Sequence, residues 1–222
     1  MKSCYTFFMK RILCFGDSNT WGYIPATGSL RRYGEDVRWT ALLQKRLGPD
    51  YRVIEFGLCG CEASGKNRSI CVNADAQSLF PPVLFASLPV DLIFIMLGTN
   101  DLKTVNQWQP GDTARGLKKL LAACHSLSPE SKIVLAPAVL LDERIVRDPE
   151  FTARAVADSR LCADEVGLLA KEEGLPLFDT NDFVEELGED GCHWSERSHA
   201  SFARGLGDFL LPLLQEASAQ RP

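Results

Sequence analysis

The residues best suited to chemistry near the amino terminus lie in one tight turn. The heptapeptide GDSNTWG occupies positions 16–22 and follows the apolar run 12–15, which is typical of a buried strand. Glycine at both ends permits a sharp turn and a close approach of the backbone. A serine on such a turn, at the carboxyl end of a strand, lies where open α/β sheets bind ligands. Ser18 is therefore a candidate nucleophile, although an ordinary strand-to-helix turn has a similar composition.

A serine nucleophile needs a general base, and histidine is the usual one. The chain has three histidines. His125 falls late in a predicted helix, where a surface or capping role is expected, and His199 falls inside the last predicted helix without an acid at a suitable spacing. His193 follows Asp190 by three residues in a turn-like stretch. That spacing lets the carboxylate accept from Nδ1–H and leaves Nε2 free to take the serine proton, so His193 is the candidate base, although an isolated pair of this kind is a weak signal.

Two more loops carry groups that could stabilise an oxyanion. Gly60 lies in the loop after the candidate strand 52–56, and Asn100 follows the apolar run 92–97. A glycine N–H and a carboxamide NH₂ are donors of the kind that a tetrahedral oxyanion requires close to the nucleophile. Glycine also leaves room for the substrate because it has no Cβ.

Short apolar runs alternate with longer helical patterns along the chain, which predicts an α/β fold with a parallel sheet. Strands are predicted at 12–15, 52–56, 92–96, 133–136 and 175–178, and helices at 36–47, 113–126, 151–173 and 195–214. A flavodoxin-like strand order, 2-1-3-4-5, makes the first three strands neighbours, so the loops after them meet at one edge. Residues 23–35 and 137–149 fit neither periodicity and are candidate pocket walls.

Length and composition suit one soluble domain over residues 1–222, with 1–9 as a probable flexible extension and Met9 as an equally good start. A net charge of −5 offers no electrostatic case for nucleic acid. The longest apolar run, 92–97, is far too short for a membrane span, and Lys10 with Arg11 interrupts any signal-peptide core.

The eight cysteines show no paired framework, so free thiols in a reducing cytoplasm are expected. Cys59 and Cys61 with Cys71 could suggest a metal cluster, but no matching second pair follows.

Four blocks of the chain, GDSN at 16–19, Gly60, GTND at 98–101 and DGCH at 190–193, occur in the order of the SGNH (GDSL-type) hydrolases, which the chain resembles. The stretches LCFGDSNTWGY at 13–23, DVRWT at 36–40, VIE at 53–55 and IMLGTND at 95–101 resemble the branch of small-ester arylesterases and acyltransferases. The cysteines on both sides of Gly60 depart from that branch.

The resemblance implies a five-stranded, three-layer sandwich and a serine esterase that needs no cofactor. Ser18 would be the nucleophile, His193 the base and then the acid, and Asp190 the residue that orients it, while Ser18 N–H, Gly60 N–H and the Asn100 side chain would form the oxyanion hole. Asp17 would brace the turn. Trp21, Tyr23 and Trp194 are candidates to line the substrate site, with packing into the core as the alternative.

The expected partner is a small acetyl or aryl ester, with acyl transfer to alcohols as a further possibility. Acetylated carbohydrates and lysophospholipids are alternatives, because one constellation serves all of them. A homo-oligomer is also expected from the resemblance, with residues 23–35 and 137–149 as possible contacts.

Two other functional classes fit parts of the sequence. Residues 60–67 approximate a phosphate-binding loop, but Asn67 stands where Ser or Thr would hold Mg²⁺. A non-catalytic binding protein could also retain this fold.

Overall fold

A computed structural model describes residues 9–25, 30–66 and 74–219. Residues 1–8 of the predicted extension, together with Cys71 and Asn67, lie outside these ranges. No helix in the part of the chain that is described has the length and apolar character of a membrane span.

Four parallel strands form the central sheet: β1 (Lys10–Gly16), β2 (Tyr51–Gly57), β3 (Leu92–Leu97) and β4 (Lys132–Pro137). Their order is β2-β1-β3-β4. Every side chain of β3 is buried, as its unbroken apolar sequence predicts for a central strand covered on both faces. The predicted α/β class and the predicted strand order are confirmed for these strands.

The fifth predicted strand is reduced to a single bridge. Leu177 pairs in parallel with Leu135 of β4, supported by hydrogen bonds from Leu135 N to Pro176 O (3.2 Å) and from Phe178 N to Leu135 O (2.9 Å). The chain then turns at once into η4 (Thr180–Asp182), whose first turn is capped by the Asp179 carboxylate. The run 175–178 thus occupies the predicted edge position without extending into a ladder.

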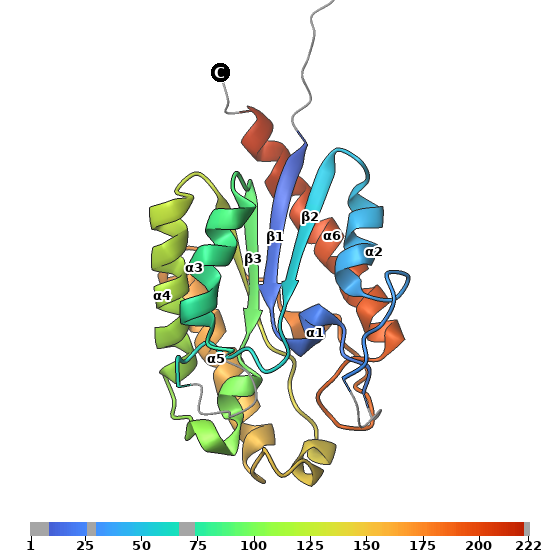
Figure 1. The fold of residues 1–222 in the computed structure, drawn as a ribbon, viewed down its shortest axis with the longest axis vertical. Helices are drawn as coiled ribbons and strands as arrows, with labels where there is room; N and C mark the ends of the chain where they lie inside the picture. Colours follow the sequence, from blue (N-terminus) through green and yellow to red (C-terminus); the bar gives the residue numbers. More distant parts are fainter. Residues whose placement is uncertain (1–8, 26–29, 67–73, 220–222) are drawn as a thin grey trace, which may run out of the picture.

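Within the described ranges, α-helices lie on both faces of the sheet, and one short α-helix follows β1 directly (Figure 1). The α-helices are α1 (Ser18–Trp21), α2 (Trp39–Leu47), α3 (Ala76–Ser87), α4 (Asp112–Leu127), α5 (Ala155–Glu172) and α6 (Glu196–Ala219). Short 3₁₀ turns follow β3 and β4: η1 (Asn100–Leu102), η2 (Thr104–Asn106) and η3 (Glu143–Arg147). Helices α3, α4 and α5 pack on one face, and α2 and α6 on the other, which gives three layers.

Helix α2 begins at Trp39 instead of 36 and α5 at Ala155 instead of 151, and two larger features also differ from the sequence prediction. Helix α3 was not predicted, because Pro81 and Pro82 stand inside it and proline normally disfavours a helix interior. Helix α6 continues through Pro212 instead of fraying there. Both helices bury an apolar face against the sheet, and this packing outweighs the local cost of the prolines.

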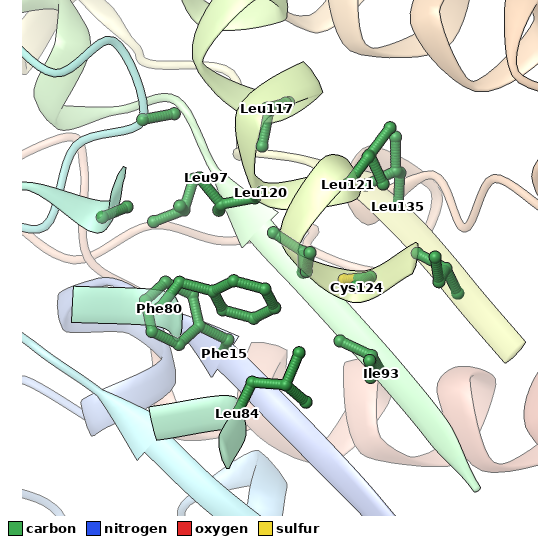
Figure 2. Packing of buried hydrophobic residues seen from close by; sticks show 14 of the residues in the cluster. Phe15, Phe80, Leu84, Ile93, Leu97, Leu117, Leu120, Leu121, Cys124 and Leu135 are labelled. Carbon is green, nitrogen blue, oxygen red and sulfur yellow. The ribbon is translucent and has the colours of Figure 1, made fainter. Parts of the chain in front are cut away.

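The larger core cluster lies between the sheet and α3, α4 and α5. Figure 2 shows Phe80 of α3 against Phe15 of β1, and their rings meet edge to face with centroids 4.9 Å apart. Leu117, Leu120 and Leu121 of α4 reach the same cluster and are almost wholly buried. This packing holds the strands rigidly, and the loops after β1, β2 and β3 depend on that rigidity for their positions.

Gly116 in α4 allows this helix to approach the loop that follows β2. A Cβ at position 116 would overlap the Ala63 carbonyl, whereas a Cβ at Gly167 of α5 would meet only the Leu177 side chain, at 3.7 Å. We predict that Gly116→Ala lowers the free energy of unfolding by about 1 to 3 kcal/mol, since backbone atoms must move. Gly167→Ala, its matched control, should raise it by about 0.5 to 1 kcal/mol through helix propensity. Urea unfolding of both variants measures the difference, and equal changes would contradict this packing.

Candidate active site

Ser18 begins a single helical turn directly after β1. Asp17 caps that turn, because its carboxylate accepts a hydrogen bond from Asn19 N (2.9 Å). Burial raises the pKa of Asp17 to about 6. Gly16 is needed at the strand end, since a Cβ there would overlap Thr20 and come within 2.9 Å of the Met96 carbonyl. Asp17 therefore braces the turn, as predicted, and Ser18 is held at the carboxyl edge of the sheet.

His193 and Asp190 lie in the turn that precedes α6. One Asp190 oxygen accepts from Cys192 N (3.0 Å) and His193 N (2.9 Å), and the other lies 2.8 Å from His193 Nδ1. Desolvation opposes ionisation of Asp190, but its hydrogen bonds to His193 and Cys192 hold its pKa below the usual value. The carboxylate is therefore charged at neutral pH and fixes the imidazole ring.

The structure brings Ser18, His193 and Asp190 into one hydrogen-bonded chain. His193 Nε2 lies 2.9 Å from Ser18 Oγ. Because Nδ1 faces a carboxylate, we assign the proton of neutral His193 to Nδ1, which leaves the lone pair of Nε2 directed at the serine hydroxyl. This is the arrangement in which a histidine can take the proton of an attacking serine.

Asn19 connects the serine turn to the turn that carries His193, a role that the sequence did not reveal. Its side-chain amide donates to Cys192 O (3.2 Å), and its side-chain oxygen accepts from Trp194 N (3.1 Å). These two bonds hold the residues on either side of His193 against the serine turn. The only sequence signal was the position of Asn19 directly after Ser18.

Gly60 and Asn100, the predicted oxyanion donors, both line the same pocket as Ser18. Gly60 has a positive φ of 82°, which favours glycine at this position. Asn100 begins η1 after β3, and one of its amide hydrogens donates to Cys61 O (3.0 Å). A carboxamide has a second N–H, so this bond orients Asn100 and ties it to the Gly60 loop without using all of its donors.

Asp101 holds the end of the Gly60 loop through hydrogen bonds to its backbone. Its carboxylate accepts from Ala63 N (3.0 Å), Ser64 N (2.9 Å) and Thr113 Oγ1 (3.0 Å). The side chain is completely buried, and desolvation raises its pKa to about 7. Asp101 therefore connects η1, α4 and the loop after β2 in one buried network.

The pocket around Ser18 has a volume of about 220 Å³. Its wall contains Ser18, Tyr23, Cys59, Gly60, Asn100, Lys103, Ile145, Asp148, Glu150, Phe151, Asp190, Cys192 and His193. The two stretches predicted as pocket walls both contribute, through Tyr23 and through Ile145 and Asp148.

Of the three aromatic residues predicted to line the substrate site, only Tyr23 does so. Tyr23 lines the pocket, and its ring centroid lies 4.3 Å from that of His193. Trp194 does not line the pocket; the alternative of packing into the core holds instead, because Trp194 is fully buried against Phe202 in the cluster between the sheet and α2 and α6. Trp21 lies outside the pocket wall, with the Arg32 guanidinium 5.3 Å over its ring. For Trp21 and Trp194, packing contacts took precedence over their position next to reactive residues.

The remaining histidines do not reach the site. His199 is fully buried, and desolvation lowers its pKa to about 3, so it stays neutral. His125 lies exposed in the last turn of α4. Both observations agree with the sequence interpretation.

Two alternative sites receive no support from the described residues. Lys66 of the phosphate-loop-like stretch is held by the Asp112 carboxylate and donates to Gln107 O (3.0 Å). Among the residues that the structure describes, there is no cluster of three or more His, Cys, Asp or Glu suited to a metal ion. Cys59 lines the pocket, but burial raises its pKa to about 11, so the thiol is protonated at neutral pH.

Protonation of Asp101 should make stability depend on pH. Its pKa is about 7 in the folded protein and about 3.9 in an unfolded chain, so between these values the folded state holds a proton that the unfolded state has released. The free energy of unfolding therefore falls as pH rises from about 4 to 7. We predict that Asp101→Asn removes about 2 to 3 kcal/mol of the fall between pH 5 and pH 8, measured by urea unfolding. Asp164→Asn, which removes an exposed carboxyl from α5, controls for the loss of one charge; the same slope in wild type and Asp101→Asn would contradict the assignment.

The overall fold is similar to those of solved structures described as esterases. The inhibitor-bound aryl esterase of M. smegmatis is 30% identical, with a TM-score of 0.84 over 92% of this chain and 99% of that chain. A carbohydrate acetylesterase from Sinorhizobium meliloti is 29% identical, with a TM-score of 0.81 over 92% and 99%. A putative arylesterase from Agrobacterium tumefaciens str. C58 is 27% identical, with a TM-score of 0.78 over 91% and 98%.

A search of curated proteins found no match. The model of the GDSL-like lipase/acylhydrolase family matches residues 14–200, a span that runs from β1 to α6 and includes all of the predicted site residues. The chain therefore belongs to the GDSL-like lipase/acylhydrolase family and is a carboxylic ester hydrolase.

Proposed function

We propose that this enzyme hydrolyses small acetyl or aryl esters through a covalent ester of Ser18. The observation that carries the proposal is the continuous chain from Ser18 Oγ through His193 to Asp190, with both bonds between side chains at 2.8 to 2.9 Å. These three side chains line a pocket that a small ester can enter.

In the first half-reaction, His193 Nε2 takes the proton of Ser18 as its oxygen attacks the ester carbonyl. The imidazolium that forms is stabilised by the charged Asp190 carboxylate. His193 then gives the proton to the leaving alcohol, and the acyl group remains on Ser18. In the second half-reaction, His193 activates a water that releases the acid. If an alcohol replaces this water, the product is a new ester, so acyl transfer uses the same groups.

The negative oxygen of each tetrahedral intermediate would lie against Ser18 N–H, Gly60 N–H and the free N–H of Asn100. These donors come from three different strand ends, and the bond from Asn100 to Cys61 O fixes two of the three loops relative to each other. Donors held in place before reaction stabilise the transition state without the cost of reorganising solvent.

The pocket volume of about 220 Å³ lies below the range of about 300 to 1,000 Å³ that is common for drug-sized ligands. Ile145 and Phe151 supply a limited apolar surface on one side. These features favour a short acyl chain over the long chain of a lysophospholipid.

Acetylated carbohydrates are a second candidate class, favoured by the charged side chains of the pocket. Lys103, Asp148 and Glu150 all reach its wall, and such groups can donate to or accept from hydroxyls. The carbohydrate acetylesterase noted above is consistent with this candidate.

Removal of the nucleophile tests the proposal directly. We predict that Ser18→Ala lowers kcat on 4-nitrophenyl acetate by about 10⁴- to 10⁶-fold without added metal. Ser201→Ala on α6, outside the pocket wall, is the matched control and should keep wild-type rates. Wild-type kcat/KM should fall from acetate to butyrate to octanoate, since the pocket is small. Full activity in Ser18→Ala would overturn the mechanism, and a preference for octanoate would overturn the short-chain assignment.

Asn100 allows a test of the oxyanion hole. Asn100→Ala should lower kcat by about 10²- to 10³-fold with little change in KM, because the lost hydrogen bond acts mainly in the transition state. Asn100→Asp should be slower still, since a carboxylate would repel the developing negative charge. Steady-state kinetics on 4-nitrophenyl acetate separate kcat from KM; a loss confined to KM would show that Asn100 only binds the ground state.

A further inference from the structure

A second hollow lies beside the pocket of Ser18 and has a volume of about 190 Å³. One side is formed by residues 102–110, which follow the oxyanion residue Asn100, and the other by residues 152–158 at the start of α5. Lys103 lines both the hollow and the pocket. The two spaces therefore share a wall, and that wall lies three residues from Asn100.

The shared wall is a narrow contact between two segments. Lys103 Nζ pairs with Glu150 Oε2 at 2.8 Å, and Thr104 N donates to Glu150 O at 2.7 Å. The Lys103 side chain is only 15% exposed, whereas that of Glu150 is 47% exposed. The Glu150 side chain is therefore the part of this wall that is most accessible to solvent, and a substrate group passing from Ser18 toward the hollow would have to displace it from Lys103.

The wall of the hollow combines an aromatic ring with neutral hydrogen-bonding groups. Trp108 packs against the small cluster that contains Leu102 and Phe151, and its indole N–H donates to Thr113 Oγ1 (3.0 Å), which fixes the ring. Thr104, Gln107, Gln109 and Thr152 contribute hydroxyl and amide groups around it.

The charged side chains of the hollow are paired. Lys103 faces Glu150, and Arg154 lies 3.4 Å from Asp158. Because each cation already has a carboxylate partner, the hollow does not favour an anionic ligand. A ring with apolar C–H faces and several hydroxyls matches it better, since such a ring can pack on indole while its hydroxyls bond to amides.

The backbone of the hollow is also strained at one point. Gln107 has φ 48° and ψ 50° and is the one non-glycine residue with positive φ in the described part of the chain. Lys66 Nζ holds this conformation by donating to Gln107 O (3.0 Å), while it also pairs with Asp112. Gln107 is the C-cap residue of η2, and its N–H donates to Thr104 O, so the left-handed conformation turns the chain at the wall of the hollow.

We propose that the hollow is a subsite for the leaving group of the substrate, and that it binds a neutral polyhydroxylated ring such as the sugar of an O-acetylated glycoside. This inference rests on the proposed esterase function and adds to it the chemical class of the alcohol. The acetyl group would enter the pocket at Ser18, and the sugar would pass Lys103 toward Trp108.

The first test compares two acetates that differ only in their alcohol. Methyl acetate has a leaving group too small to reach the hollow, whereas methyl 6-O-acetyl-glucopyranoside can fill it. Thr104→Trp, at an exposed position of the wall, should lower the ratio of kcat/KM for the sugar ester over methyl acetate by about tenfold, mainly through KM. Gln109→Ala should lower the same ratio about threefold, so the test does not depend on one variant folding. Gln215→Trp on α6 is the matched control and should leave the ratio unchanged.

A ratio that stays unchanged in both Thr104→Trp and Gln109→Ala would overturn the subsite. A second measurement separates this failure from failure of the esterase itself. Methyl β-glucopyranoside titrated into the full chain should shift the NMR signal of the Trp108 indole N–H, and Thr104→Trp should abolish this shift. If no ester is hydrolysed in a Ser18-dependent way, the proposed esterase function fails, and the titration alone then tests the subsite. The absence of a shift of the Trp108 signal would overturn the subsite.

Discussion

The hydrogen bond between Ser18 Oγ and His193 Nε2 joins two turns that are 175 residues apart in the chain. A bond of 2.9 Å between two side chains tolerates little movement of either backbone. The serine turn is attached to β1, and the histidine turn is attached to α6, on the opposite face from α3 and α4. The sheet and the layer that contains α6 must therefore hold fixed positions relative to each other for this bond to form.

Buried acids do much of the positioning. Asp17 caps the serine turn, and Asp101 holds the Gly60 loop by accepting from two backbone N–H groups. Desolvation by burial raises the pKa of both carboxyl groups. Asp190 differs, since its bonds to His193 and Cys192 keep its pKa low. The three carboxyl groups therefore differ in role: Asp17 and Asp101 brace loops, whereas Asp190 bonds to the imidazole and has a lowered pKa.

The site also shows why neighbouring residues in sequence do not share a role. His193 lines the pocket, but Trp194 points into the core against Phe202. Tyr23 lies against His193, while Trp21 lies under Arg32. In each pair one ring, that of Tyr23 or His193, lines the pocket, and the ring of the tryptophan packs outside it.

The two adjacent hollows also depend on the tertiary structure. Their shared wall at Lys103 is formed by two segments that are almost fifty residues apart in the sequence.

The sequence by itself determined the chemistry and the general architecture. Ser18, Asp190 and His193 could be recognised because their short motifs occur together with Gly60 and Asn100 in one order along the chain. The apolar runs predicted strands because burial on both faces requires them. Only the tertiary structure decided that the fifth strand shrinks to one bridge, that α3 forms across Pro81 and Pro82, and that Asn19 and Asp101 hold the loops together. These features depend on contacts between distant segments, whose free energy outweighs local propensity and leaves no periodic signal in the chain.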